Sequence, residues 1–166
     1  MGRLSENSVL NIKNKSHAVT AQVDIPQAGG AGVIVAQGGA FGGWTLYLHQ
    51  GRPTYCYNLL GLGHVKVTGD AAVPAGEHQI RMEFAYDGGG LGKGGNIALY
   101  LDGTQVADGR LDMSIPMVFS ADETTDVGSD CATRSATTTA PKTVPSPAAC
   151  AGSRSTSATM PRTPTI

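Results

Sequence analysis

The sequence predicts an all-β protein, folded as an antiparallel β-sandwich or jelly roll. Two observations predict this class. Short segments alternate apolar and polar side chains, which is the period of a strand with one buried face, and glycine-rich turns separate them. Glycine makes up 23 of the 166 residues, about twice its average share. No segment has the 3.6-residue period of a long amphipathic helix.

The first half of the chain predicts five strands. The clearest covers residues 17–25, where Val19, Val23 and Ile25 face one side and Pro26 ends the segment. The turn Gln50-Gly51 predicts a hairpin. The other four predicted strands cover 33–36, 44–49, 52–59 and 64–68, with a glycine-rich loop at 37–43.

A three-stranded meander follows, predicted over 78–86, 97–101 and 104–109. The glycine-rich stretch 87–95 is predicted as a loop, and Asp102-Gly103 has the composition of a two-residue hairpin turn. Such a meander needs a second apolar layer against its buried face. The earlier strands are therefore expected to supply the other sheet of a sandwich.

Bulk properties exclude several classes of protein. No apolar run approaches the roughly 20 residues that span a membrane, and the start of the chain has no apolar stretch typical of a secretory signal. A cytoplasmic location is therefore expected. The chain lacks the basic stripe of a nucleic-acid-binding protein. Its three cysteines cannot all pair, and Cys56 is interpreted as a small core residue in a reducing compartment.

The composition changes sharply near residue 130. Residues 1–130 hold all 13 acidic and 8 of the 12 basic residues, for a net charge of -5, whereas 131–166 hold 4 basic residues, no acid and no aromatic residue. A segment of this kind buries too little to offset its ordering entropy. The predicted organisation is an irregular lead-in at 1–16, a β-sandwich domain at 17–130 and a disordered tail at 131–166.

Several long strings of residues resemble one family. They include HAVTAQVDIP, GVIVAQGGAFGGWTLYLHQGRPTYCYNLLGL, PAGEHQIRMEFAYDGGGLGKGG and FSADETTDVGSD. Together they resemble the C-terminal domain of large bacterial arylsulfatases, over about residues 5–130. The strand–Asp-Gly–strand pattern is also similar to sandwiches of the concanavalin or laminin-G type.

The resemblance implies a non-catalytic accessory domain of an arylsulfatase, present as a fragment whose partner is the sulfatase catalytic domain. In that family the hydrolysis of sulfate esters uses a formylglycine and a divalent cation, expected to be calcium, and both belong to the preceding domain. No cofactor and no catalytic residue are expected in this chain itself. The alternative is a freestanding lectin-like module with weak carbohydrate binding.

The tail departs from the family, whose members continue with a closing strand reading Trp-Val-Gln-Ile-Asp. One set of codons that can encode residues 148–156 gives this string when it is read one base earlier, so the tail is interpreted as a frameshifted translation. Cys150 to Arg154 differs by one residue from the sulfatase nucleophile signature. Without a strand–helix context this match is interpreted as coincidence.

The candidate site residues fall in two loops. Asp87, Gly90, Gly92, Lys93 and Gly95 lie in a stretch that satisfies G-x-G-x-x-G, but no helix follows to receive a phosphate. An interdomain or ligand loop is the preferred interpretation. The second group is a set of acidic residues that could offer oxygen ligands to calcium without EF-hand spacing, namely Asp122, Glu123, Asp126 and Asp130.

Histidines and aromatic residues are weighed in the same way. His78 lies on the apolar side of its predicted strand and is expected to be a hydrogen-bonded core histidine. A sugar-stacking platform is one interpretation of the aromatic residues Trp44, Tyr47, Tyr55 and Tyr57. At strand spacing such residues are more often core and cross-strand pairs.

Overall fold

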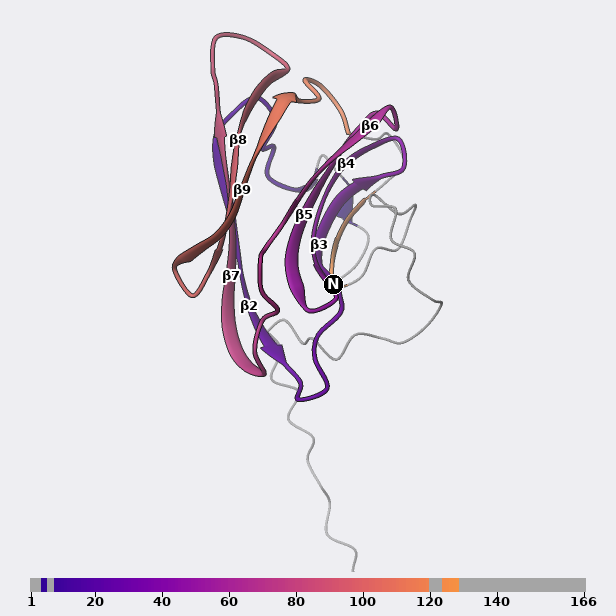
Figure 1. Ribbon diagram of the computed structural model, residues 1–166. Coiled ribbons are helices and arrows are strands. Elements are labelled where there is room, and N and C mark those ends of the chain that lie inside the picture. Colours follow the sequence, from indigo (N-terminus) through magenta and orange to yellow (C-terminus); the bar gives the residue numbers. More distant parts are fainter. Residues whose placement is uncertain (1–3, 6–7, 120–123, 129–166) are drawn as a thin grey trace, which may run out of the picture.

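The computed structural model describes residues 4–5, 8–119 and 124–128, which form two antiparallel sheets packed face to face (Figure 1). The described residues contain no α-helix. The six-stranded sheet has the order β1 (Leu4–Ser5), β10 (Thr124–Val127), β3 (Gly32–Gly39), β4 (Gly42–His49), β5 (Arg52–Leu59), β6 (Gly63–Thr68). The four-stranded sheet has the order β2 (His17–Ile25), β7 (Gly76–Tyr86), β8 (Lys93–Leu101), β9 (Thr104–Met113). The predicted all-β sandwich is confirmed.

The alternating segments became strands because each has an apolar face to bury, and in β4 and β5 both faces are buried. β2 and β5 have the predicted bounds, and β2 pairs with β7 in continuous register from His17 opposite Phe84 to Ile25 opposite Gly76. Alternate side chains of both sheets meet in one core, where Leu46, Met82 and Leu99 are fully buried. Each large aliphatic side chain buried in this way stabilises the fold by about 1.5–3 kcal/mol.

Three turns join paired strands through two residues with positive φ. They are Gln50-Gly51, Leu60-Gly61 and Asp102-Gly103. This backbone shape matches the twist of the strands it connects. Asp102 is held further, because its carboxylate accepts hydrogen bonds from the Gln79 N–H at 2.7 Å and from His78 Nδ1 at 2.6 Å. These two contacts, the Gln79 amide foremost, lower the pKa of Asp102.

The predicted glycine-rich loops are shorter than expected. β3 continues to Gly39 and β4 starts at Gly42, so the loop predicted at 37–43 is a tight hairpin. Likewise β8 starts at Lys93, within the loop predicted at 87–95. Glycine there permits close approach: a Cβ on Gly94 would lie 2.1 Å from the Leu111 carbonyl oxygen. The sequence alone does not distinguish a glycine that lets two strands approach closely from a glycine that is needed in a turn.

The lead-in predicted as irregular also contributes to the sandwich. Leu4 and Ser5 form β1, which pairs with β10. Cys56 is buried as predicted, but it lies with Tyr47 and Val33 in a small cluster separate from the main core. The described ranges include no helix with the length and hydropathy of a membrane span. The predicted disordered, frameshifted tail at 131–166 lies outside the described residues.

Candidate functional site

Four connecting segments meet at one end of the sandwich, which we call the loop end (upper end in Figure 1). They are the β3–β4 turn at 40–41, the β5–β6 turn at 60–62, the β7–β8 loop at 87–92 and the segment 114–119 after β9. Asn58 links the first two, since its Nδ2 donates to the Gly39 and Ala40 carbonyls and its Oδ1 accepts from the Gly61 N–H. These bonds hold two turns of the six-stranded sheet together.

Asn14 links the other two segments to the lead-in. Its Nδ2 donates to the Pro116 carbonyl at 2.7 Å, and its Oδ1 accepts from the Gly92 N–H at 2.7 Å. Asn14 has φ of 59°, a left-handed conformation that asparagine tolerates better than most residues. One side chain therefore joins three segments that are distant in sequence.

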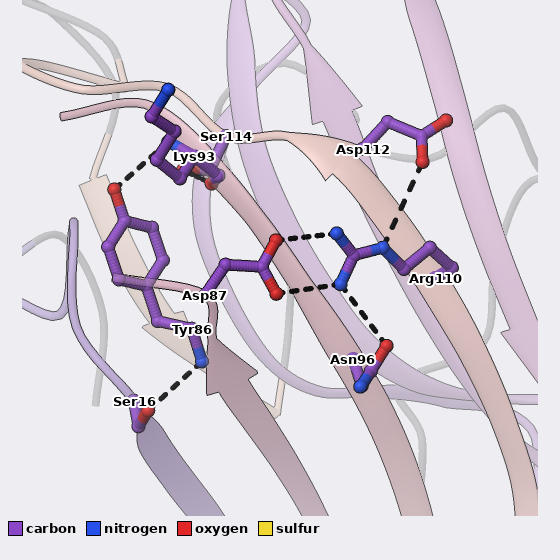
Figure 2. Close-up of polar contacts among 8 residues, drawn as sticks. All are labelled: Ser16, Tyr86, Asp87, Lys93, Asn96, Arg110, Asp112 and Ser114. Atoms are coloured by element: carbon purple, nitrogen blue, oxygen red, sulfur yellow. Dashed lines mark hydrogen bonds and ion pairs between the residues drawn. The ribbon is translucent and has the colours of Figure 1, made fainter. Parts of the chain in front are cut away.

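Tyr86 closes the β7–β8 loop, as Figure 2 shows. Its hydroxyl donates to the Gly90 carbonyl at 2.5 Å and accepts from the Lys93 N–H at 2.9 Å. Its own N–H donates to Ser16 Oγ at 3.0 Å. Ser114 adds a further tie, because its Oγ donates to the Lys93 carbonyl at 2.7 Å. The loop is thus bonded across its base and to the lead-in.

An ion pair braces the outer side of the same loop. Arg110 binds the two carboxylate oxygens of Asp87 at 2.8 and 2.5 Å and also donates to Asn96 Oδ1 at 3.2 Å (Figure 2). This hydrogen bonding by Arg110 lowers the pKa of Asp87, and Asp87 raises the pKa of Arg110. Both groups are exposed, so water and salt weaken the pair. The Arg110–Asp87 pair therefore contributes more to the position of Asp87 at the base of the loop than to the stability of the fold.

Large apolar side chains are exposed at the loop end. Within the described residues, eight large hydrophobic residues are exposed, and seven of them lie on the four connecting segments or at the adjoining end of β9. We call these seven the apolar set: Phe41, Leu60, Leu62, Leu91, Met113, Met117 and Val118. Single exposed apolar residues are ordinary, and their concentration in one region makes the loop end the candidate site.

The backbone conformation of Leu60 is a separate observation on the same region. This residue has φ of 54° and is 51% exposed. A left-handed conformation costs a residue with a Cβ roughly 1–2 kcal/mol, and glycine or asparagine would fit this turn better. Neither backbone preference nor core packing accounts for a leucine at this position.

A narrow cavity lies between the sheets beneath the loop end. Its wall includes Trp44, Phe84 and Phe119, and residues 12–14 form part of its lining. His17 Nδ1 lies 3.1 Å from the Lys15 carbonyl, which can only accept, so His17 donates through Nδ1. Burial lowers the pKa of His17, and its Nε2 is buried without a protein partner. The interior has room for about one water molecule.

The structure places the predicted loop residues in two groups. Gly90 and Gly92 have positive φ and belong to the β7–β8 loop, at whose base Asp87 lies. Lys93 begins β8, and Gly95 is buried within it, where a Cβ would lie 2.5 Å from the Ala85 carbonyl oxygen. Gly95 is therefore a packing residue rather than part of a ligand loop. The G-x-G-x-x-G stretch leads into a strand, which offers no helix N-terminus to a phosphate.

The predicted acidic group is described at one position. Asp126 lies in β10 opposite Ala36, and its side chain is buried. Asp122, Glu123 and Asp130 lie outside the described residues, as does Cys150. Among the residues that the structure describes, no three His, Cys, Asp or Glu side chains lie together so as to hold a metal ion.

The aromatic residues are buried, which agrees with the core interpretation and not with a sugar-stacking platform. Trp44, Tyr55 and Tyr57 belong to the main core, and Tyr47 lies in the small cluster with Cys56. Trp44 stacks on Tyr55 with ring centroids 6.0 Å apart. Burial raises the pKa of Tyr57 to about 12, and its hydroxyl accepts a hydrogen bond from the Ile115 N–H at 2.7 Å.

His78 forms the hydrogen bond that was expected, but it lies at the margin of the core. Its side chain is 17% exposed, and its partner Asp102 is at the β8–β9 turn. The pair ties that hairpin to β7. It lies away from the loop end.

Comparisons with known proteins bear on the fold. No family model matches the chain, and no curated protein matches it either. Among solved structures, the chain is similar to domains LG4-5 of the mouse laminin α1 chain, with a TM-score of 0.53, 17% sequence identity and coverage of 87% of this chain and 34% of the laminin chain. It also matches a SAP-like pentraxin from Limulus polyphemus, with a TM-score of 0.45, 13% identity and coverage of 73% and 54%. The chain shares the two-sheet β-sandwich fold of the laminin domains. It spans about a third of the laminin chain and about half of the pentraxin chain.

Sequence reasoning missed Asn14 and the apolar set. Asn14 sits in Asn-Lys-Ser, within a lead-in that has no periodic pattern. The apolar set offered a usable signal, because Leu60, Leu62 and Leu91 each occupy a position beside a glycine where a polar turn residue is usual.

Proposed function

We propose that this chain is a non-catalytic accessory domain of an arylsulfatase and that its loop end packs against the catalytic domain. The family assignment rests on the resemblance over residues 5–130. The observation that carries the docking role is the concentration of the apolar set at one end of the sandwich. Sulfate-ester hydrolysis, the formylglycine and the divalent cation belong to the partner domain in this proposal.

The size of the surface supports a protein partner. If each exposed side chain of the apolar set offers on the order of 100 Å², the set as a whole presents several hundred Å². This area approaches the ~800 Å² that one partner contributes to a standard interface. Leucine, methionine and phenylalanine offer shape without hydrogen bonds. Apart from the exposed Phe41 ring these side chains are aliphatic or thioether groups, which suit a pre-formed protein surface better than a sugar, whose hydroxyl groups need polar partners.

Binding to a separately expressed sulfatase catalytic domain of the resembling family tests the proposal. The informative variants are Leu62→Glu, Leu91→Glu and Met117→Glu, each placing a charge where an apolar contact is expected. Gln105→Glu is the matched control, since Gln105 is exposed on β9 eight residues before Met113, or roughly 26 Å along the strand. We expect the wild type to bind, each loop-end variant to lose at least about tenfold in affinity, and the control to stay within about twofold.

Three outcomes would overturn the proposal. The first is a wild-type chain that does not bind the catalytic domain. The second is an equal loss for Gln105→Glu. The third is self-association in solution that Leu62→Glu abolishes, which would assign the surface to a second copy of this chain. A glycan array discriminates the alternative function: sugar binding by the wild type without binding to the catalytic domain would favour a carbohydrate-binding module.

A further inference from the structure

We infer that Asn14 is a positioning residue of this docking surface, holding Leu91 and Met117 in a fixed relation to one another. The inference rests on the proposed function and adds to it a residue outside the apolar set. Asn14 bonds to Gly92, the residue after Leu91, and to Pro116, the residue before Met117. Through these backbone neighbours, the side-chain amide of Asn14 connects the two segments that carry Leu91 and Met117.

The chemistry of this position suits asparagine. It needs an acceptor for the Gly92 N–H, a donor for the Pro116 carbonyl and a backbone with φ of 59°. Aspartate supplies the acceptor but, when ionised, no donor. Glycine supplies the backbone conformation but neither polar group. These two residues therefore separate the contributions of the side chain from those of the backbone.

Without such ties the β7–β8 loop would be a flexible segment. Glycine gives an unbonded chain the greatest conformational freedom, and four glycines of the loop have positive φ, namely Gly88, Gly89, Gly90 and Gly92. The backbone of Ser114 bonds to the Gly92 carbonyl at 3.1 Å, so one end of the 114–119 segment is held. Asn14 extends this connection to Pro116, beside Met117. A surface fixed before association loses less entropy on docking.

Asn14 makes its hydrogen bonds outside the hydrophobic core. The residue is absent from the cluster of buried hydrophobic side chains, and its partners are backbone groups of connecting segments and the Tyr86 hydroxyl. Loss of its side chain is expected to leave the sandwich folded and the thermal midpoint close to that of the wild type. The effect should appear in the motion of the loop end and in affinity.

The test compares Asn14→Gly and Asn14→Asp with the control Gln105→Glu, which makes the same change from amide to carboxylate at an exposed position of β9, at the opposite end of that strand from the loop end. In the isolated chain, NMR hydrogen exchange of the Gly92 amide should accelerate at least tenfold in Asn14→Gly and change little in Asn14→Asp, which keeps the acceptor. Unchanged exchange in Asn14→Gly would overturn the inference whether or not the partner binds.

Affinity for the sulfatase catalytic domain gives the second readout. Both Asn14 variants should bind three- to tenfold more weakly than the wild type, and Gln105→Glu should bind as well as the wild type. The affinity of Asn14→Asp should be compared with that of the wild type at each pH. The difference should shrink as the pH falls, because protonation of the new carboxyl restores a hydrogen-bond donor for the Pro116 carbonyl. Accelerated exchange with unchanged affinity overturns the positioning role. Failure of the wild type to bind overturns instead the proposed function.

Discussion

Gly94 provides the sharpest test of where β8 begins. A Cβ at this position would lie 2.1 Å from the Leu111 carbonyl oxygen and 2.7 Å from that of Asp112. Both are backbone atoms, so no side-chain rotation relieves the contact, and Gly94→Ala must push β8 and β9 apart by about 1 Å. Overpacking of this kind costs about 1–3 kcal/mol, and each neighbouring hydrogen bond that is stretched adds about 1 kcal/mol. We expect a total of roughly 3–5 kcal/mol.

Gly88→Ala is the matched comparison. A Cβ on Gly88 meets nothing within 4 Å, but its φ of 74° makes alanine cost about 1–2 kcal/mol. At about 4 °C per kcal/mol for a domain of this size, thermal unfolding should shift down by roughly 12–20 °C for Gly94→Ala and by roughly 4–8 °C for Gly88→Ala. Equal shifts would show that both glycines lie in one loop and that β8 does not begin at Lys93.

Further predictions concern the core, the ion pair and the buried thiol. Met82→Ala should lower the free energy of unfolding by about 2–5 kcal/mol in urea titration, because Met82 is fully buried; a loss below about 1 kcal/mol would contradict the packing. The pKa of Asp87 is lowered in the folded state, to below the ordinary 3.8, so its pairing with Arg110 stabilises the fold only while this carboxyl is ionised. Arg110→Gln should therefore lower the free energy of unfolding at pH 6, and this loss should vanish as the pH falls through the folded pKa of Asp87. A loss as large at pH 2 as at pH 6 would refute this. Burial raises the pKa of Cys56, so with the two cysteines beyond residue 130 replaced by serine, a thiol reagent should react slowly with the native chain and completely once it is unfolded.

The loop end shows how one set of glycines serves two purposes. Gly88 to Gly92 let the chain turn, whereas Gly94 and Gly95 let two strands approach each other and Phe84 lie against the backbone. Both uses produce the same letters in the sequence. The predicted loop at 87–95 therefore combined a loop and the start of a strand, and only the neighbouring β9 and β7 distinguish them.

The sequence by itself determined the fold class, because alternation of side chains is a local property. It predicted β2 and β5 at their observed bounds and the turn at Asp102-Gly103. Only the tertiary structure decided which strands form which sheet, that β1 and β10 pair, and that the loop end gathers the apolar set. Those features depend on contacts between segments such as Asn14 and Pro116, 102 positions apart, and no periodicity within a segment reports where a distant segment will lie.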